Sequence, residues 1–233
     1  WRDVDTIINA AAYTAVDLAE TEPGRRDCWR ANVSGGANLC RVAREHRLRL
    51  VHISSDYVFD GTAEIHTEDE PFSPLGVYAQ TKAAGDALVG QLDRHYLVRT
   101  SWVIGDGRNF VRTMAELAAK GIQPSVVDDQ FGRPTFTTDL AAGIVHLLQT
   151  EAPFGTYNLS NDGPVVAWCD IARKVFALCG RSEADVTGQS TQDYSAGKTT
   201  APRPQHSALD LTKLLATGFA PAPWPDRLAE YLS

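Results

Sequence analysis

Two patterns of apolar and polar positions alternate along the first half of the chain. Short, nearly continuous apolar runs occupy residues 4–11, 48–53 and 96–100, which is typical of strands buried on both faces of a parallel sheet. Residues 26–46 and 77–92 instead carry apolar side chains at helical spacing. Strands that alternate with helices predict an α/β fold with a partial, doubly wound, Rossmann-like parallel sheet.

The second half of the chain predicts shorter elements. Helices are expected over residues 110–119, 139–148 and 168–179, with Thr138 as the N-cap of the second, and a short strand over 156–159. We expect these elements to form a smaller region beside the sheet.

The C-terminal part of the sequence is rich in loop-forming residues. Ser, Thr, Gly and Pro dominate the stretch 188–204, which predicts a loop that covers or lines a site. Two short helices are expected after it, over residues 211–217 and 224–232.

Composition narrows the class of protein. With 43% hydrophobic and 22% charged residues and no apolar run near the roughly 20 residues of a membrane span, the chain reads as a soluble globular protein without membrane contact. A net charge of -7 argues against a nucleic-acid partner. The four cysteines lack the spacing of a zinc site and the density of a disulfide scaffold, which predicts reduced thiols in the cytoplasm.

Tyr78 and Lys82 are the first candidates for chemistry. Four residues apart on a predicted helix, they share one face. A nearby ammonium lowers the pKa of a phenol, so Tyr78 could protonate a carbonyl oxygen. The pair alone is weak evidence, since Tyr and Lys often share a solvated helix face. Ser54 and Ser55, however, lie at the carboxyl end of the predicted strand 48–53, and open parallel sheets bind ligands at this end of their strands.

Three segments carry a resemblance to a known family. Residues 52–61, His-Ile-Ser-Ser-Asp-Tyr-Val-Phe-Asp-Gly, are similar to a signature of the dTDP-4-dehydrorhamnose reductases, extended short-chain dehydrogenases/reductases. Tyr-Ala-Gln-Thr-Lys at 78–82 resembles a second signature, and residues 9–17 with Glu20 resemble a third. Further similarities extend the resemblance over nearly the whole chain, at residues 99–102, 107–110, 129–135 and 201–204.

The resemblance implies an activity and catalytic roles. Members of the family reduce the 4-keto group of a dTDP-6-deoxyhexulose with NADPH or NADH and give dTDP-L-rhamnose. By resemblance, Ser55 orients the carbonyl, Tyr78 is the general acid, and Lys82 tunes Tyr78 and binds the nicotinamide ribose.

The resemblance also implies further cofactor and substrate residues. The loop with Ala10, Ala11 and Tyr13 would pass against the cofactor, and Asn32 would help to hold the proton path beside the catalytic lysine. For the sugar nucleotide, an aromatic ring, an amide and a guanidinium suit sugar or base, hydroxyl and diphosphate. The residues that we select for these contacts are Trp102, Asn109 and Arg203, each of which could equally be structural.

The sequence also suggests a wall of the substrate site, and it leaves the metal and the oligomeric state open. A wall on the substrate side is expected from Gln130, Gly132, Pro134 and Thr135, with Gly and Pro setting the turn. Some family members bind Mg²⁺ at a dimer contact, so Mg²⁺ and a homodimer are possible, although no local spacing identifies a metal-ligand set.

One expected pattern is missing from the sequence. Dinucleotide folds hold the pyrophosphate on a glycine-rich loop after their first strand, and no residues match it. We therefore expect the strand 4–11 to be the fourth of the full fold, preceded by two strand–helix units and a further strand, roughly 60 residues at about 30 per unit. The dinucleotide-binding and catalytic part is assigned to residues 1–103 and 137–160, and the substrate-binding part to 104–136 and 161–233.

Two other functions compete with a reductase. One is a non-catalytic binding module, because the regulatory subunit of methionine adenosyltransferase is similar to this family. The other is an epimerase or dehydratase of the same fold, which fits residues 54–61 less well. Ser55, Tyr78 and Lys82 together favour the reductase, because a scaffold has no need for three groups that converge on one carbonyl.

Overall fold

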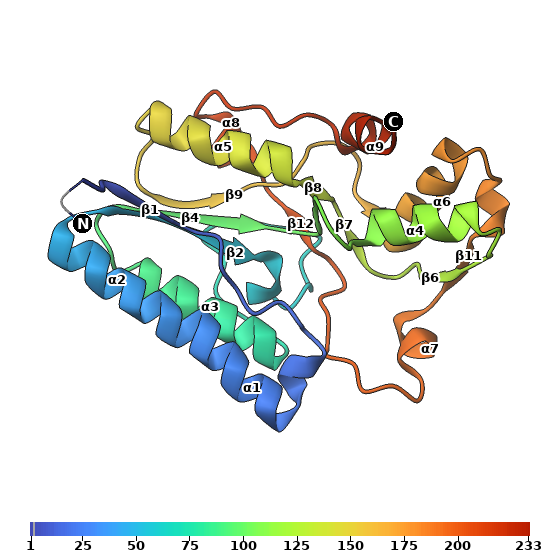
Figure 1. Cartoon of the computed structure of the whole chain (residues 1–233), viewed down its shortest axis with the longest axis horizontal. Helices are drawn as coiled ribbons and strands as arrows, with labels where there is room; N and C mark the ends of the chain where they lie inside the picture. Colours follow the sequence, from blue (N-terminus) through green and yellow to red (C-terminus); the bar gives the residue numbers. More distant parts are fainter. Residues whose placement is uncertain (2) are drawn as a thin grey trace.

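A four-stranded parallel sheet lies at the centre of the molecule. The computed structural model describes residues 1 and 3–233. The sheet order is β1-β2-β4-β9, and every pairing is parallel (Figure 1). Its strands are β1 (Thr6–Asn9), β2 (Arg49–Ser55), β4 (His95–Thr100) and β9 (Gly155–Asn158). The predicted α/β fold with a Rossmann-like parallel sheet is confirmed.

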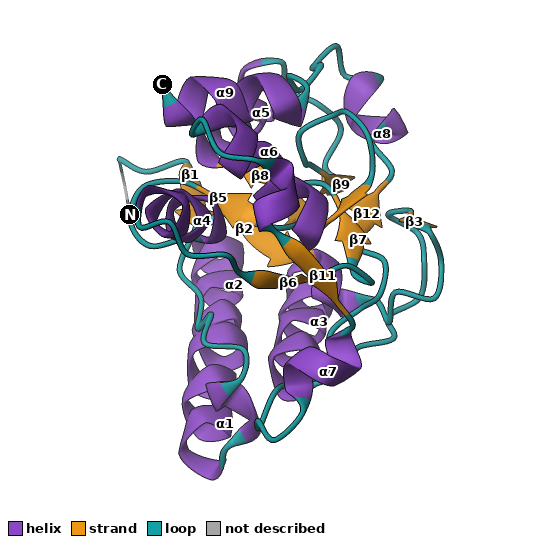
Figure 2. Cartoon of the chain, turned by 90° about the vertical axis from the view of Figure 1, so that its right-hand side faces the viewer, coloured by secondary structure: helices purple, strands orange, loops and turns teal. Residues whose placement is uncertain are grey.

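Helices cover both faces of this sheet. Successive side chains of a strand point to opposite faces. In β4, Leu97 packs with α2 (Gly35–His46) and α3 (Val77–Val89), whereas Tyr96 and Val98 pack with α5 (Thr137–Gln149) on the other face. All six residues of β4 are buried, which explains its continuous apolar pattern. Figure 2 shows α2 and α3 side by side beneath the sheet.

A nearly continuous helical stretch precedes β2. It consists of α1 (Glu22–Trp29), a π-helical turn (Arg30–Ser34) and α2 (Gly35–His46). Thr21 caps its start through an oxygen that accepts the Gly24 amide at 3.2 Å. The prediction over residues 26–46 found this helix but missed the change of pitch within it.

The second region is built from helices and two-stranded ladders. Its core gathers residues of α4 (Phe110–Ala119), α6 (Trp168–Leu178) and α9 (Trp224–Leu232). The other α-helices and strands of the whole chain are α3 (Val77–Val89), α5 (Thr137–Gln149), α7 (Thr191–Ser195), α8 (Thr212–Leu215), β3 (Ile65–His66), β5 (Val103–Ile104), β6 (Ser125–Val127), β7 (Phe131–Gly132), β8 (Thr135–Phe136), β10 (Val166–Ala167), β11 (Thr187–Gln189) and β12 (Ala208–Leu209). The domain boundaries proposed above stay a prediction.

Two local predictions need correction. Helix α5 begins at Thr137, so Thr138 lies inside its first turn and is not the N-cap. The stretch 188–204, expected to be mostly loop, also contains α7, which Ser190 caps by accepting the Asp193 amide at 3.0 Å. Within the part of the chain that the structure describes, no helix is both long and apolar enough to cross a membrane.

Candidate active site

The start of helix α3 is fixed by a residue far away in sequence. The Val77 amide, one of the donors that a helix start leaves unpaired, donates to Glu20 Oε1 at 2.8 Å. A carboxylate is favourable at the positive end of a helix. A Cβ on Gly76 would lie 2.7 Å from the same oxygen, so a larger residue at position 76 would displace the Glu20 carboxylate. Glu20 therefore sets where the helix with Tyr78 and Lys82 begins.

Lys82 lies buried against the end of β2. Its side chain is on α3, the residue is 3% exposed, and Nζ donates to the Ile53 carbonyl at 2.7 Å. Burial lowers the pKa of Lys82, while the Asp86 carboxylate opposes that shift. An ammonium has three N–H donors. In the described part of the chain only one is used, which leaves two for a ligand.

Tyr78 is half-buried one helical turn before Lys82, with its ring edge-on to Tyr57 at 5.6 Å between centroids. Burial raises the pKa of Tyr78, as does the negative charge of Asp56, whereas a hydrogen bond with Ser55 lowers it. The sequence led us to expect a lowered pKa. The structure contradicts that expectation: the phenol stays protonated at neutral pH, but it is a weaker acid than a free tyrosine.

Ser55 ends β2 and is hydrogen-bonded to its neighbours. Its Oγ donates to Asp56 Oδ1 at 2.9 Å and accepts the Tyr57 amide at 3.2 Å. Asp56 is 2% exposed, and burial raises its pKa to about 6. Because a hydroxyl has one proton, Ser55 in this arrangement faces the site only as an acceptor.

The predicted cofactor loop follows β1. Ala10 and Ala11 are exposed and Tyr13 is half-buried. The Tyr13 amide donates to Asn32 Oδ1 at 2.8 Å, and Asn32 Nδ2 donates to Thr81 Oγ1 at 3.0 Å. Asn32 thus contacts this loop and the catalytic helix, and its predicted role in a proton path stays a prediction.

Arg203 is the one predicted substrate residue at the cavity beside Tyr57. The cavity measures about 360 Å³ and is lined among others by Tyr57, Trp168, Gln130 and Arg203. Arg203 Nη2 donates to Asp17 Oδ1 at 2.8 Å, which holds the guanidinium at the wall. Aromatic faces beside a guanidinium suit a ligand with a flat ring and an anionic group.

Trp102 packs against the core of the second region, to which α4 and α6 contribute. It stacks on Trp168 at 3.9 Å between ring centroids, and its backbone has a φ of 46°. A Cβ on Gly132 would lie 2.8 Å from the Trp102 ring, so the ring requires glycine there. Its predicted contact with the sugar nucleotide stays a prediction.

Asn109 caps helix α4. Its Oδ1 accepts the Arg112 amide at 3.0 Å, and its Nδ2 donates to the Gly105 carbonyl at 2.7 Å and to the Tyr231 hydroxyl at 2.8 Å. With its amide engaged in these bonds, Asn109 would have to exchange a partner to contact substrate. That contact, too, stays a prediction.

Sequence reasoning missed how the α7 segment is attached. The carboxylate of Asp129 accepts the Thr191 amide at 2.9 Å, and Gln130 Nε2 donates to Thr191 Oγ1 at 2.9 Å. Thr191 and Gln130 also line the cavity. Gln130 was expected to help form a wall, but nothing in the sequence indicated that α7 would dock on it and on Asp129.

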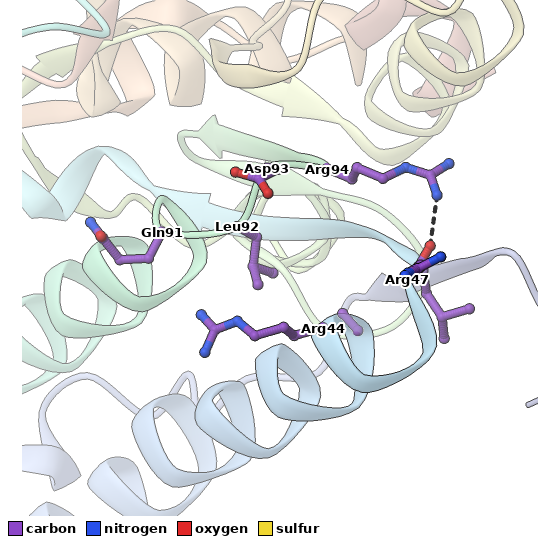
Figure 3. Close-up of a pocket in the computed structure, with 8 residues that line it drawn as sticks. Arg44, Arg47, Gln91, Leu92, Asp93 and Arg94 are labelled. Carbon is purple, nitrogen blue, oxygen red and sulfur yellow. Dashed lines mark hydrogen bonds between the residues drawn. The ribbon is translucent and has the colours of Figure 1, made fainter.

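A second cavity lies at the other end of the sheet. It measures about 310 Å³ and is lined by residues that include Arg44, Arg47, Asp93 and Arg94 (Figure 3). Arg94 Nη1 donates to the Arg47 carbonyl at 2.6 Å. Arg44 and Arg47 stand at the C-terminus of α2, where cations complement the helix dipole. None of the predicted site residues lines this cavity.

Comparison with known proteins identifies the family. The family model described as the RmlD substrate binding domain matches residues 2–233. The chain belongs to this family. The dTDP-4-dehydrorhamnose reductase of Aggregatibacter actinomycetemcomitans is 37% identical over 234 residues, covering 94% of this chain and 78% of that protein. The dTDP-4-keto-6-deoxy-D-glucose reductase of Streptomyces niveus is 36% identical, covering 93% and 74%.

A solved structure agrees with this assignment to the RmlD family. The dTDP-4-dehydrorhamnose reductase of Bacillus anthracis, in complex with NADP, has a TM-score of 0.89 and 35% identity, covering 97% of this chain and 79% of that one. Among residues 1 and 3–233, no cluster of three or more His, Cys, Asp or Glu side chains could hold a metal ion. Nothing in the described residues therefore supports the Mg²⁺ site left open above.

Proposed function

We propose that this protein is an NAD(P)H-dependent reductase of the 4-keto group of a dTDP-6-deoxyhexulose, acting in dTDP-L-rhamnose biosynthesis. One observation carries the proposal: Ser55, Tyr78 and Lys82 meet where β2 ends and α3 begins, in an RmlD-family chain. The names of relatives at 36–37% identity support the substrate class.

The residues at this site fit a nicotinamide cofactor. Lys82 keeps two N–H donors for ribose hydroxyls, and the exposed, small side chains of Ala10 and Ala11 leave room for a flat ring system. When bound, the cofactor supplies the hydride. The NADP complex of the Bacillus anthracis relative supports NADPH as the cofactor.

The chain supplies the proton. Tyr78 donates its phenolic proton to the oxygen of the 4-keto group as hydride addition turns that oxygen into an alkoxide, which is a stronger base than a phenolate even with the raised pKa of Tyr78. The Lys82 ammonium stabilises the phenolate that remains. Ser55 holds the substrate oxygen beside Tyr78 once its hydroxyl turns away from Asp56.

The cavity lined by Tyr57, Trp168 and Arg203 is the proposed site of the dTDP moiety. Tyr57 and Trp168 offer faces for the base or sugar, and Arg203 offers a guanidinium for the diphosphate. Trp102 and Asn109 remain candidates for further contacts. Because the Streptomyces niveus relative is named for a different keto sugar, both sugars belong in the assay.

We also propose a cytoplasmic location and a homodimeric assembly. A cytoplasmic location is supported by four cysteines that form no disulfide. A homodimer is supported by apolar side chains left exposed near α1, with Leu18 at 60% and Trp29 at 40%. Light scattering with and without Mg²⁺ tests both the dimer and its dependence on the ion.

Tyr78→Phe tests the mechanism. With dTDP-4-dehydrorhamnose and NADPH, followed at the nicotinamide absorbance, we expect kcat to fall by roughly 10²- to 10⁴-fold because the general acid is lost. The control is Tyr157→Phe, which removes a hydroxyl bonded to the Pro153 carbonyl at 2.7 Å in the core. Full activity of Tyr78→Phe would refute the mechanism. A protein that binds NADPH but reduces neither sugar would favour the regulatory-module function.

A further inference from the structure

The π-helical turn places a polar side chain in the interior beside the catalytic helix. Turns of this type are rare and often occur at functional sites. Asn32 lies within the turn and is 4% exposed. A Cβ on Gly85 of α3 would lie 3.3 Å from the Asn32 carbonyl oxygen. The small residue at 85 therefore lets the turn approach α3 closely.

One end of the Asn32 amide is bonded to the catalytic helix through Thr81. Asn32 Nδ2 donates to Thr81 Oγ1 at 3.0 Å, and Thr81 Oγ1 donates to the Tyr78 carbonyl at 2.7 Å. The Cys28 thiol lies 3.2 Å from the same hydroxyl. Thr81 is fully buried and directly precedes Lys82. Its hydroxyl thus accepts one hydrogen bond and donates another beside both catalytic side chains.

The same amide is bonded to the loop that follows β1. Asn32 Oδ1 accepts the Tyr13 amide at 2.8 Å, and Nδ2 donates to the Tyr13 carbonyl at 3.3 Å. The rings of Tyr13 and Tyr78 also pack against one apolar cluster that contains Cys28 and Val77. A single side chain therefore connects the predicted cofactor loop to the helix of the proton donor.

We propose that Thr81 is a positioning residue, which acts through Asn32 to fix the loop of Ala10 to Tyr13 relative to Tyr78 and Lys82. This inference rests on the proposed function, in which the loop and the helix form two walls of one nicotinamide site. Without the Thr81 hydroxyl, the Asn32 amide loses the acceptor that orients it toward α3. The Tyr13 amide then loses a fixed partner, and a displacement of about 1 Å in a reacting geometry can cost up to 10²-fold in rate.

Thr81→Val tests the inference, because valine has the shape of threonine without its hydroxyl. In the protein without cofactor, hydrogen exchange of the Tyr13 amide should become about two- to tenfold faster, as expected for the loss of one hydrogen bond. The dissociation constant for NADPH should rise by a similar factor. Thr81→Ser keeps the hydroxyl and should restore both values.

The control is Thr217→Val. Thr217 Oγ1 also donates to the carbonyl three residues earlier, Leu214, at 2.6 Å, but near α8 and away from the site. This variant should change neither the Tyr13 exchange nor the NADPH affinity. If Thr81→Val does not fold, Thr81→Ala removes the same hydroxyl without filling the space of the methyl group.

The outcomes separate this inference from the proposed function. Unchanged Tyr13 exchange or unchanged NADPH affinity in a folded Thr81 variant would overturn the inference, as would failure of Thr81→Ser to restore them. If the unmodified protein does not bind NADPH, or if Tyr78→Phe keeps full activity, the result counts instead against the proposed function. The exchange measurement needs neither substrate nor cofactor, so it reports on the connection itself.

Discussion

The hydroxyl of Ser55 has one proton, and that proton points to Asp56 rather than to the open site. A protonated Asp56 could instead donate to Ser55 and release the serine proton toward a substrate oxygen. Because burial raises the pKa of Asp56 to about 6, both forms are accessible near neutral pH. Sequence predicted Ser55 from its place at a strand end, but the direction of its proton depends on how deeply Asp56 is buried.

Asp56→Asn should change how stability depends on pH. The pKa of Asp56 rises from an ordinary 3.8 to about 6 in the folded protein. Between these values the folded state binds a proton that the unfolded state has lost, so stability falls as pH rises from about 4 to about 6. Asparagine has no such titration, so we expect the variant to gain about 1–3 kcal/mol relative to the parent across this window. Denaturant unfolding at pH 4 and pH 7 measures it, and parallel pH curves would contradict the assignment.

Sequence predicted those helices best whose apolar spacing and end signals depend only on residues nearby in the chain. The helices over residues 110–119 and 224–232 were placed at both ends, because apolar spacing and adjacent stop signals such as Gly121, with a φ of 70°, depend on nearby residues alone. The π-helical turn was not foreseen; it lies against Gly85 of a different helix, a contact that local spacing does not reveal. The attachment of α7 was missed for the same reason, as Asp129 is far away in sequence.

The docking of α7 leads to a prediction about the substrate cavity. Thr191→Val removes the hydroxyl that bonds to Asp129 and Gln130 while keeping the backbone bond to Asp129. Because this bond holds a cavity wall and not the reacting groups, KM for the dTDP sugar should rise about two- to tenfold. The value of kcat should stay near that of the parent.

Steady-state kinetics with both keto sugars checks this expectation. The matched control is Thr150→Val, at the end of α5, where the Thr150 hydroxyl bonds to the His146 carbonyl at 2.8 Å. A lower kcat with unchanged KM for Thr191→Val would show that the segment serves the chemical step instead.

At the scale of the whole molecule, the structure connects motifs that the sequence showed only as separate matches. Glu20, from the motif of residues 9–17 and 20, caps the helix that carries Tyr78 and Lys82. Asp17, from the same motif, binds Arg203 in the last one. These contacts join positions up to 186 residues apart. The motifs could be predicted from sequence, whereas their mutual support required the fold.

The central claim is hydride transfer to the 4-keto carbon, and deuterium labelling tests it most directly. The protein is incubated with dTDP-4-dehydrorhamnose and NADPH deuterated at the transferable nicotinamide position, and the product is examined by NMR and mass spectrometry. We predict one deuterium at C4 of the product sugar for each cofactor oxidised. Unoxidised cofactor, or deuterium at a different carbon, would contradict a 4-keto reductase.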